Sequence, residues 1–132
     1  MERFVIQVRR TQDGITFVLL DPNGNVAAIS RTFRNERWLQ IGLRLLSYYA
    51  VDAPLVGSGI DVSGMGAHYA VMRLENDRRR FILMTEFGKE LLRSREYDTR
   101  LEMEREIQAL RDMAQGWLDK GEMQYRYVGA IE

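Results

Sequence analysis

The chain has 132 residues, enough for one domain or for two half-size units that share a core, but not for two independent domains. Nineteen basic residues balance nineteen acidic ones, which excludes a strong overall field that would draw the protein to nucleic acid or to an anionic membrane. The sequence has no Cys, no signal-peptide core and no apolar run approaching the roughly 20 residues of a membrane span. We therefore expect a soluble, cytoplasmic protein without membrane contact, disulfides or thiolate metal sites.

The first part of the chain predicts three short strands followed by a helix. The strands are expected at residues 4–10, 15–20 and 26–30. Gly14 and Gly24 mark the two intervening turns, because Gly accepts the positive φ that tight turns require. Asn35 is a good N-cap for the helix, Pro54 limits it, and a short strand is expected near residues 55–56.

The second part of the chain repeats the first. Residues 79–114 align with residues 15–50 at a constant offset of 64 positions. The matched pairs include Phe17 and Phe81, Leu19 and Leu83, Gly24 and Gly88, Ser30 and Ser94, Arg31 and Arg95, and Phe33 and Tyr97. We expect the first hairpin of the second copy to be one residue shorter, which aligns Phe4 with Tyr69 and Ile6 with Val71.

The two predicted helices also correspond. Thr99 is a good N-cap, and Glu102 three residues later completes a capping box. Gly116 or Gly121 is expected to end this helix. Each helix carries an apolar stripe at spacings of three and four, which we expect to pack on the sheet: Leu39, Leu43, Leu46 and Ala50 in the first copy, and Met103, Ile107, Leu110 and Ala114 in the second.

These patterns predict an α+β fold in which two tandem β-β-β-α units, each closed by a further strand, share an antiparallel sheet about a pseudo-two-fold axis. The predicted layout is a single domain over residues 1–132. It comprises repeat one at 3–50, a Gly-containing connector at 51–67, repeat two at 68–116 and a tail at 117–132. The alternating pattern of residues 125–131 predicts a last strand within that tail.

The order of these motifs resembles the YegP-like family of uncharacterised bacterial proteins. The matching residues of the first copy are Phe4, Ile6, Phe17, Leu19, Asn23-Gly24-Asn25-Val26, Ser30, Phe33 and the helix from Asn35. The second copy matches at Phe81, Leu83, Gly88, Ser94 and Tyr97, but has Glu86-Phe87 before its Gly. The resemblance implies β(3)-α-β units, in tandem or as dimers, that build one sheet and exchange their last strands. It implies no activity and no catalytic residues.

The clearest difference between the copies lies on the helices. Beside its core stripe, the first helix carries a second apolar stripe made of Trp38, Ile41, Leu45 and Tyr48. The aligned residues of the second helix are Glu102, Arg105, Ala109 and Asp112. Covering four such side chains would contribute on the order of 6–10 kcal/mol before entropy losses. Either the connector or the tail covers this stripe, or it is an interaction surface for a partner, the simplest being a second copy in a homodimer.

The Arg residues suggest a different kind of site. Arg78, Arg79 and Arg80 form a basic run, and Arg31 and Arg95 are a matched pair. Together they could bind an anion or nucleic acid. The acidic neighbours of the run favour instead a solvated charge run that guards a sheet edge.

The sequence offers little for catalysis. His68 is the only His and has no partner recognisable by spacing, so a structural role is favoured over general base or ligand. Ser30 and Ser94 lack a nearby base and are better explained by backbone hydrogen bonding than as nucleophiles. The glycines between residues 57 and 66 do not fit a phosphate-binding loop. We predict no cofactor and no metal site.

The leading hypothesis is therefore a non-enzymatic interaction or regulatory protein that binds a protein partner through residues 38–48 or through the shared sheet. It would serve a bacterial host, or a phage that inhibits a host complex. The alternatives are an Arg-mediated nucleic-acid or anion binder and, with less support, an enzyme around His68.

Overall fold

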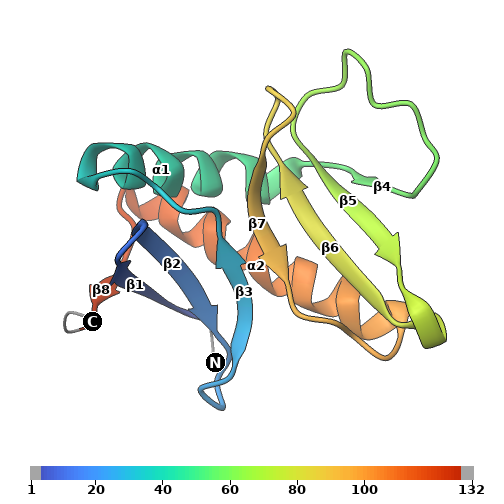
Figure 1. Ribbon diagram of the computed structural model, residues 1–132, viewed down its shortest axis with the longest axis horizontal. Helices are drawn as coiled ribbons and strands as arrows, with labels where there is room; N and C mark the ends of the chain where they lie inside the picture. The colour runs from blue at the N-terminus through green and yellow to red at the C-terminus, as the bar shows by residue number, and fades with distance from the viewer. Residues whose placement is uncertain (1–3, 129–132) are drawn as a thin grey trace.

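A computed structural model describes residues 4–128, and this part of the chain forms one eight-stranded sheet with two α-helices on one face (Figure 1). The elements are, in chain order, β1 (Val5–Thr11), β2 (Gly14–Leu20), β3 (Val26–Ser30), α1 (Glu36–Asp52), β4 (Leu55–Val56), β5 (His68–Arg73), the short 3-10 helix η1 (Glu75–Asp77), β6 (Arg79–Met84), β7 (Glu90–Ser94), α2 (Arg100–Lys120) and β8 (Arg126–Tyr127). The predicted α+β class is confirmed.

The strand order, β4-β5-β6-β7-β3-β2-β1-β8, shows that the two repeats build a single sheet. The third strands of the repeats, β3 and β7, pair antiparallel at its centre. β4 follows the helix of repeat one and pairs with β5 of repeat two, whereas β8 follows the helix of repeat two and pairs with β1 of repeat one. The repeats thus exchange their last strands, so that neither repeat has a complete sheet alone.

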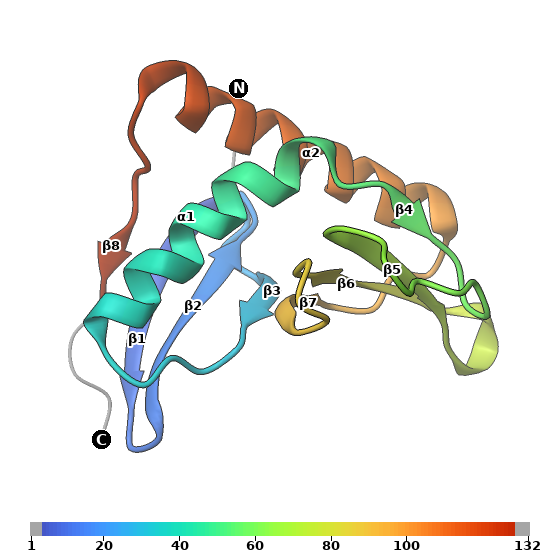
Figure 2. The same cartoon turned by 90° about the horizontal axis from the view of Figure 1, so that it is seen from above.

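The sheet is mixed, which differs from the wholly antiparallel sheet expected. The six central strands are antiparallel, but β4 with β5 and β8 with β1 are parallel. Parallel neighbours require a crossover connection rather than a hairpin. Residues 57–67 provide it for the first pair, and α2 with its following segment carries the chain back across the molecule to β1 for the second (Figure 2).

The matched residues occupy matched places. The Phe17 and Phe33 rings stack with centroids 6.1 Å apart, and the Phe81 and Tyr97 rings do so at 6.4 Å. Ile15 bridges to Phe33 as Arg79 bridges to Tyr97. The constant offset of 64 positions therefore describes one three-dimensional unit used twice.

The predicted alignment of the first strands was wrong by two residues. Val8 pairs with Phe17 and Val71 with Phe81, so Val8 is the counterpart of Val71, and Ile6 that of Tyr69. The hairpin of the second copy is longer, not shorter, because η1 inserts at its tip with Asn76 and Asp77 at positive φ. An error of two residues keeps each side chain on its predicted face, since strand side chains alternate.

Both helices begin where predicted. The Asn35 side chain accepts a hydrogen bond from the Trp38 amide, and the Thr99 hydroxyl accepts one from the Glu102 amide. Pro54 follows shortly after the end of α1. Gly121 caps α2 with φ 74°, whereas Gly116 lies inside that helix and does not end it.

Residues assigned to the connector and tail take part in the elements. Residues 51 and 52 belong to α1, and 55–56 form β4 as expected, so only residues 57–67 form an irregular connection. Of the last strand predicted at 125–131, residues 126–127 form β8, and residues 129–131 lie outside the described part.

The core lies between the helices and one face of the sheet. It contains both predicted helix stripes, all of whose members are almost wholly buried: Leu39, Leu43, Leu46, Ala50, Met103, Ile107, Leu110 and Ala114. Trp117 and Tyr69 also contribute to it. Neither helix of the described chain is long and apolar enough to cross a membrane.

Candidate functional site

The second apolar stripe of α1 is exposed. Trp38 is 50 % exposed, Ile41 37 % and Tyr48 57 %, while Leu45 is half-buried and packs against the core. The four residues are spaced three or four positions apart, so they form a second line along α1 beside the core stripe. Within residues 4–128, neither of the segments expected to cover the stripe buries it.

In the described part of the chain, the connection at 57–67 and the tail do not cover the stripe. Residues 57–67 loop out beside β4 and β5, at the far end of the sheet from the beginning of α1 (Figures 1 and 2). The tail contacts α1 through a hydrogen bond between Gln40 and the Tyr125 hydroxyl, and its β8 then pairs with β1. Trp117, the first residue of the predicted tail, is buried in the core and does not cover the stripe.

Three of the four stripe residues, Trp38, Ile41 and Leu45, line a groove of about 700 Å³. The connection from β3 to α1 forms another part of its wall, and the turn between β6 and β7 forms a third. The remaining lining residues are Asp13, Arg31, Thr32, Phe33, Arg34, Gly42, Thr85, Phe87, Lys89 and Leu91. Tyr48 lies further along the helix and does not line it. We call this the α1 groove.

The inner wall of the groove depends on Gly42. A Cβ at this position would lie 2.3 Å from Cζ of Phe33, so only Gly lets the Phe33 ring pack this closely to the helix. At the rim, Phe87 is 75 % exposed on the turn between β6 and β7. The groove therefore combines an apolar interior with exposed aromatic side chains.

The equivalent groove of repeat two, here the α2 groove, has a different character. Its lining includes Tyr97, Glu102, Arg105, Glu106 and Ala109, the counterparts of Phe33, Trp38, Ile41, Gly42 and Leu45. It encloses about 570 Å³. At three helix positions, repeat two thus presents the charged residues Glu102, Arg105 and Glu106 where repeat one has Trp38, Ile41 and Gly42.

Arg95 is held inside the α2 groove by two carboxylates. Its guanidinium lies 2.9 Å from Oδ2 of Asp21 and 2.9 Å from Oε1 of Glu106, which also accepts a hydrogen bond from Tyr97. Burial alone would lower the pKa of Arg95, but the hydrogen bonds to Glu106 and Asp21 outweigh burial and raise it. Burial raises the pKa of the Tyr97 hydroxyl, and Glu106 raises it further.

Asp21 joins this network to the turn before β3. Burial alone would raise the pKa of its carboxyl, but hydrogen bonds from Arg95 and from the backbone amides of Asn25 and Asn23 outweigh burial and hold the pKa below its usual value. Because Asp21 comes from repeat one and Arg95 from repeat two, the network links the repeats across the central pair of strands.

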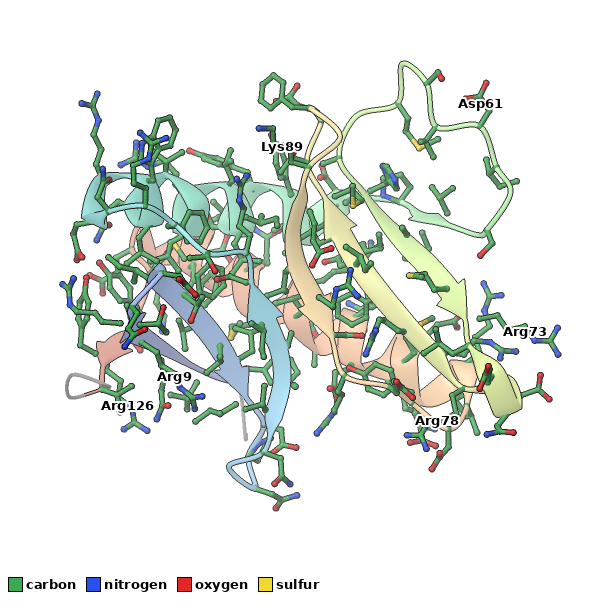
Figure 3. All side chains as sticks on the ribbon, in the orientation of Figure 1. Arg9, Asp61, Arg73, Arg78, Lys89 and Arg126 are labelled. Carbon is green, nitrogen blue, oxygen red and sulfur yellow. The ribbon has the colours of Figure 1, made fainter. Side chains whose placement is uncertain are left out.

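The predicted basic run is also paired within the chain. Arg78 lies 3.1 Å from Glu96 and 3.3 Å from Asp98, and Arg80 lies 3.6 Å from Glu96. Arg79 donates to the carbonyl oxygen of Asp77. Figure 3 shows Arg78 at the end of the sheet beside η1, remote from Lys89 and the α1 groove. The structure thus does not bring the run together with Arg31.

The candidate catalytic residues have structural surroundings. His68 is buried, and its Nδ1 lies 3.1 Å from the carbonyl oxygen of Gly66. Ser30 accepts a hydrogen bond from the Phe17 amide and donates to the Arg31 carbonyl, and Ser94 makes the equivalent bonds with Phe81 and Arg95. Among the described residues, no group of three or more His, Cys, Asp or Glu is placed to hold a metal ion.

Sequence reasoning missed Arg34, Gly42, Phe87 and Lys89 as parts of the groove. The offset of 64 offered a signal for Gly42, since its counterpart Glu106 is an unusual exchange for Gly. Phe87 and Lys89 belong to repeat two and reach the groove of repeat one only because β7 pairs with β3. No local sequence pattern indicates that Phe87 and Lys89 reach the groove of repeat one.

Comparisons with known proteins agree with this fold. No family model and no curated protein sequence matches the chain. The solution structure of YegP from E. coli, a protein of unknown function, is similar with a TM-score of 0.68 and 14 % identity over 100 % of this chain and 97 % of that one. A UPF0339 protein from Shewanella oneidensis is similar with a TM-score of 0.64 and 14 % identity, over 94 % of this chain and 89 % of that one. The predicted resemblance to the YegP-like family is thus confirmed for the fold.

Proposed function

We propose that this protein is a non-enzymatic interaction protein that binds a protein partner in the α1 groove. The observation that carries the proposal is the difference between two otherwise equivalent grooves. Trp38 and Ile41 are exposed where repeat two has Glu102 and Arg105. Because polar residues serve the fold at these positions in repeat two, folding alone does not require Trp and Ile there.

The composition of the groove favours a protein as the ligand. Trp, Tyr, Phe and Arg are the residues enriched in protein interfaces and in their energetic hot spots. The α1 groove and its margin present Trp38, Tyr48, Phe87 and Arg31. Covering the exposed half of Trp38 would contribute on the order of 1 kcal/mol. Several such contacts together can outweigh the entropy lost on association. The groove could then bind a folded or extended segment of another protein.

The test compares the wild-type protein with a variant that copies repeat two into repeat one, Trp38→Glu with Ile41→Arg. The matched control is Leu101→Glu, which removes an exposed apolar side chain of α2 outside either groove. Each immobilised protein is used to capture partners from a cell lysate, and the captured protein is purified and titrated by calorimetry.

We expect one stoichiometric partner whose affinity falls at least about tenfold for the groove variant and stays unchanged for the control. Circular dichroism and thermal melting must show that both variants fold. A folded groove variant that binds the purified partner as tightly as wild type contradicts the proposal. Light scattering of the protein alone tests self-association, and a stable dimer abolished by the groove variant would identify the partner as a second copy.

A further inference from the structure

The two equivalent grooves carry opposite charge. The lining of the α1 groove includes three basic side chains, Arg31, Arg34 and Lys89, and one acidic side chain, Asp13. The lining of the α2 groove includes two basic side chains and six acidic ones: Arg95 and Arg105, and Asp21, Glu96, Asp98, Glu102, Glu106 and Asp112. The duplication has therefore yielded one basic, aromatic groove and one acidic groove on a chain whose formal net charge is zero.

Arg31 lacks the carboxylates that hold its counterpart. Both guanidiniums lie over an aromatic ring, Arg31 at 5.9 Å from the centroid of Phe33 and Arg95 at 5.8 Å from that of Tyr97. Glu106, which pairs with Arg95, corresponds to Gly42 in repeat one.

The other partner of Arg95 is missing as well. Asp21 corresponds to Thr85, which keeps the same turn by accepting hydrogen bonds from the amides of Phe87 and Lys89 but carries no charge. Among residues 4–128, Arg31 has no ion-pair partner. In repeat two, carboxylates bind the Arg at this position. In repeat one, Arg31 at the equivalent position is exposed to solvent.

The geometry points to an acidic peptide segment of a partner protein as the occupant of the α1 groove, with Glu or Asp side chains paired to Arg31 and Lys89 and an apolar side chain between Trp38 and Leu45. This inference rests on the proposed function and specifies its ligand. The Phe33 ring attracts the Arg31 guanidinium by a cation–π interaction. The guanidinium can then bind a carboxylate through charge-assisted hydrogen bonds, which are stronger than those between neutral groups.

The position of the basic side chains favours internal acidic residues over a free carboxyl terminus. Arg31 and Arg34 lie on the connection from β3 to α1, whereas Lys89 lies on the turn between β6 and β7, where Figure 3 labels it. The basic groups therefore come from two different walls of the groove. A chain terminus supplies one carboxylate, but a segment with several acidic residues can pair with both walls.

Other occupants fit less well. A symmetric dimer centred on this groove would bring the basic residues Arg31, Arg34 and Lys89 of the two copies together, and like charges at an interface are costly. Nucleic acid is bound through many phosphate contacts, and here only three basic side chains share the lining with Ile41, Leu45 and Leu91. The light scattering described under the proposed function detects the dimer, and the oligonucleotide comparison below detects nucleic-acid binding.

The experiment selects binders from a random peptide library displayed on phage, using the full-length protein as bait. Two variants serve as further baits. The first combines Arg31→Gln with Lys89→Gln, and the second, the control, carries Arg126→Gln, which removes an exposed Arg on β8 away from the groove. From the wild-type and control baits we expect peptides that combine Glu or Asp with a large apolar residue. From the bait with Arg31→Gln and Lys89→Gln we expect no enrichment of acidic residues.

The best peptide, synthesised with both ends capped, is then titrated by fluorescence anisotropy. We expect Arg31→Gln to weaken its affinity about tenfold, Glu→Gln exchanges in the peptide to weaken it comparably, and added salt to weaken it further. Selected peptides without acidic enrichment, or an affinity indifferent to Arg31, would overturn the inference. So would tighter binding of a single-stranded oligonucleotide at the same residues.

The two proposals fail separately. A captured partner that depends on Trp38 but is insensitive to Arg31→Gln and to salt would leave the proposed function standing and refute the acidic ligand. A partner insensitive to the Trp38 variant would refute the proposed function itself.

Discussion

The buried hydroxyls of Ser30 and Ser94 give the sharpest test of the repeat. Each one accepts a hydrogen bond from a strand amide, that of Phe17 at 2.9 Å or Phe81 at 3.0 Å, and donates to the next carbonyl oxygen at 2.7 Å. Replacing either Ser by Ala leaves a buried backbone N–H without a partner, which costs about 1–3 kcal/mol, and removes a second hydrogen bond besides. We expect each variant to lose about 2–3 kcal/mol of unfolding free energy, a large share of the 5–15 kcal/mol of a typical domain.

The measurement is urea unfolding followed by circular dichroism, with Ser63→Ala in the exposed connection as the control. That control is expected to change the free energy of unfolding by less than about 0.5 kcal/mol. The slope against urea concentration is expected to stay constant, since the surface exposed on unfolding does not change. A loss below about 0.5 kcal/mol at both sites would show that the hydroxyls do not hold the strand amides. Losses that differ strongly between the sites would refute their equivalence.

Two further predictions concern the free energy of unfolding, the first for the helix glycines Gly42 and Gly116 and the second for the buried carboxylate of Asp21. Gly42→Ala is expected to destabilise the protein by about 1–3 kcal/mol because its Cβ meets the Phe33 ring, whereas Gly116→Ala, with no atom within 4 Å, is expected to stabilise α2 by up to about 1 kcal/mol in thermal melts. Asp21→Asn is expected to cost about 1–2 kcal/mol at neutral pH, because the pair with Arg95 is lost. Since folding lowers the pKa of Asp21, its contribution is present above the unfolded pKa of about 3.9 and disappears as pH falls through the folded pKa, so wild type and variant should converge in acid. An unchanged difference well below that pKa would contradict the charge effect.

Much of the fold could be predicted from local patterns. Alternation, turn glycines and N-caps gave three strands and a helix in each repeat, and the offset of 64 residues joined them into one unit. The hairpin of β5 and β6 was predicted with the wrong length, because its tip holds Asn76 and Asp77 at positive φ, a conformation that their sequence permits but does not require. The outer strands β4 and β8 were expected, but their parallel pairing was not, because each is only two residues long and too short for periodicity to indicate a pairing.

The candidate site was predicted only in part, and the reason is again physical. Trp38, Ile41 and Leu45 could be found because a second apolar stripe on a helix is visible at helical spacing. Whether such a stripe is covered depends on where distant segments lie, and here the connection at 57–67 and the described part of the tail, residues 117–128, do not cover it. The charge of the groove could not be read from single motifs, since Lys89 joins Arg31 only through the pairing of β3 with β7.

The pairing of β3 with β7 joins the two repeats at the centre of the sheet, and residues at their corresponding positions differ in charge. The Asp21–Arg95–Glu106 network ties the repeats together on one side of the central pair. On the other side the corresponding positions, Thr85, Arg31 and Gly42, make no such network within the described chain. Thr85 holds its turn by accepting hydrogen bonds from the amides of Phe87 and Lys89, so this turn involves no ion pair with Arg31. One copy thus pairs its Arg with carboxylates of the same chain, whereas Arg31 has no ion-pair partner within residues 4–128, and the proposed acidic ligand rests on this difference.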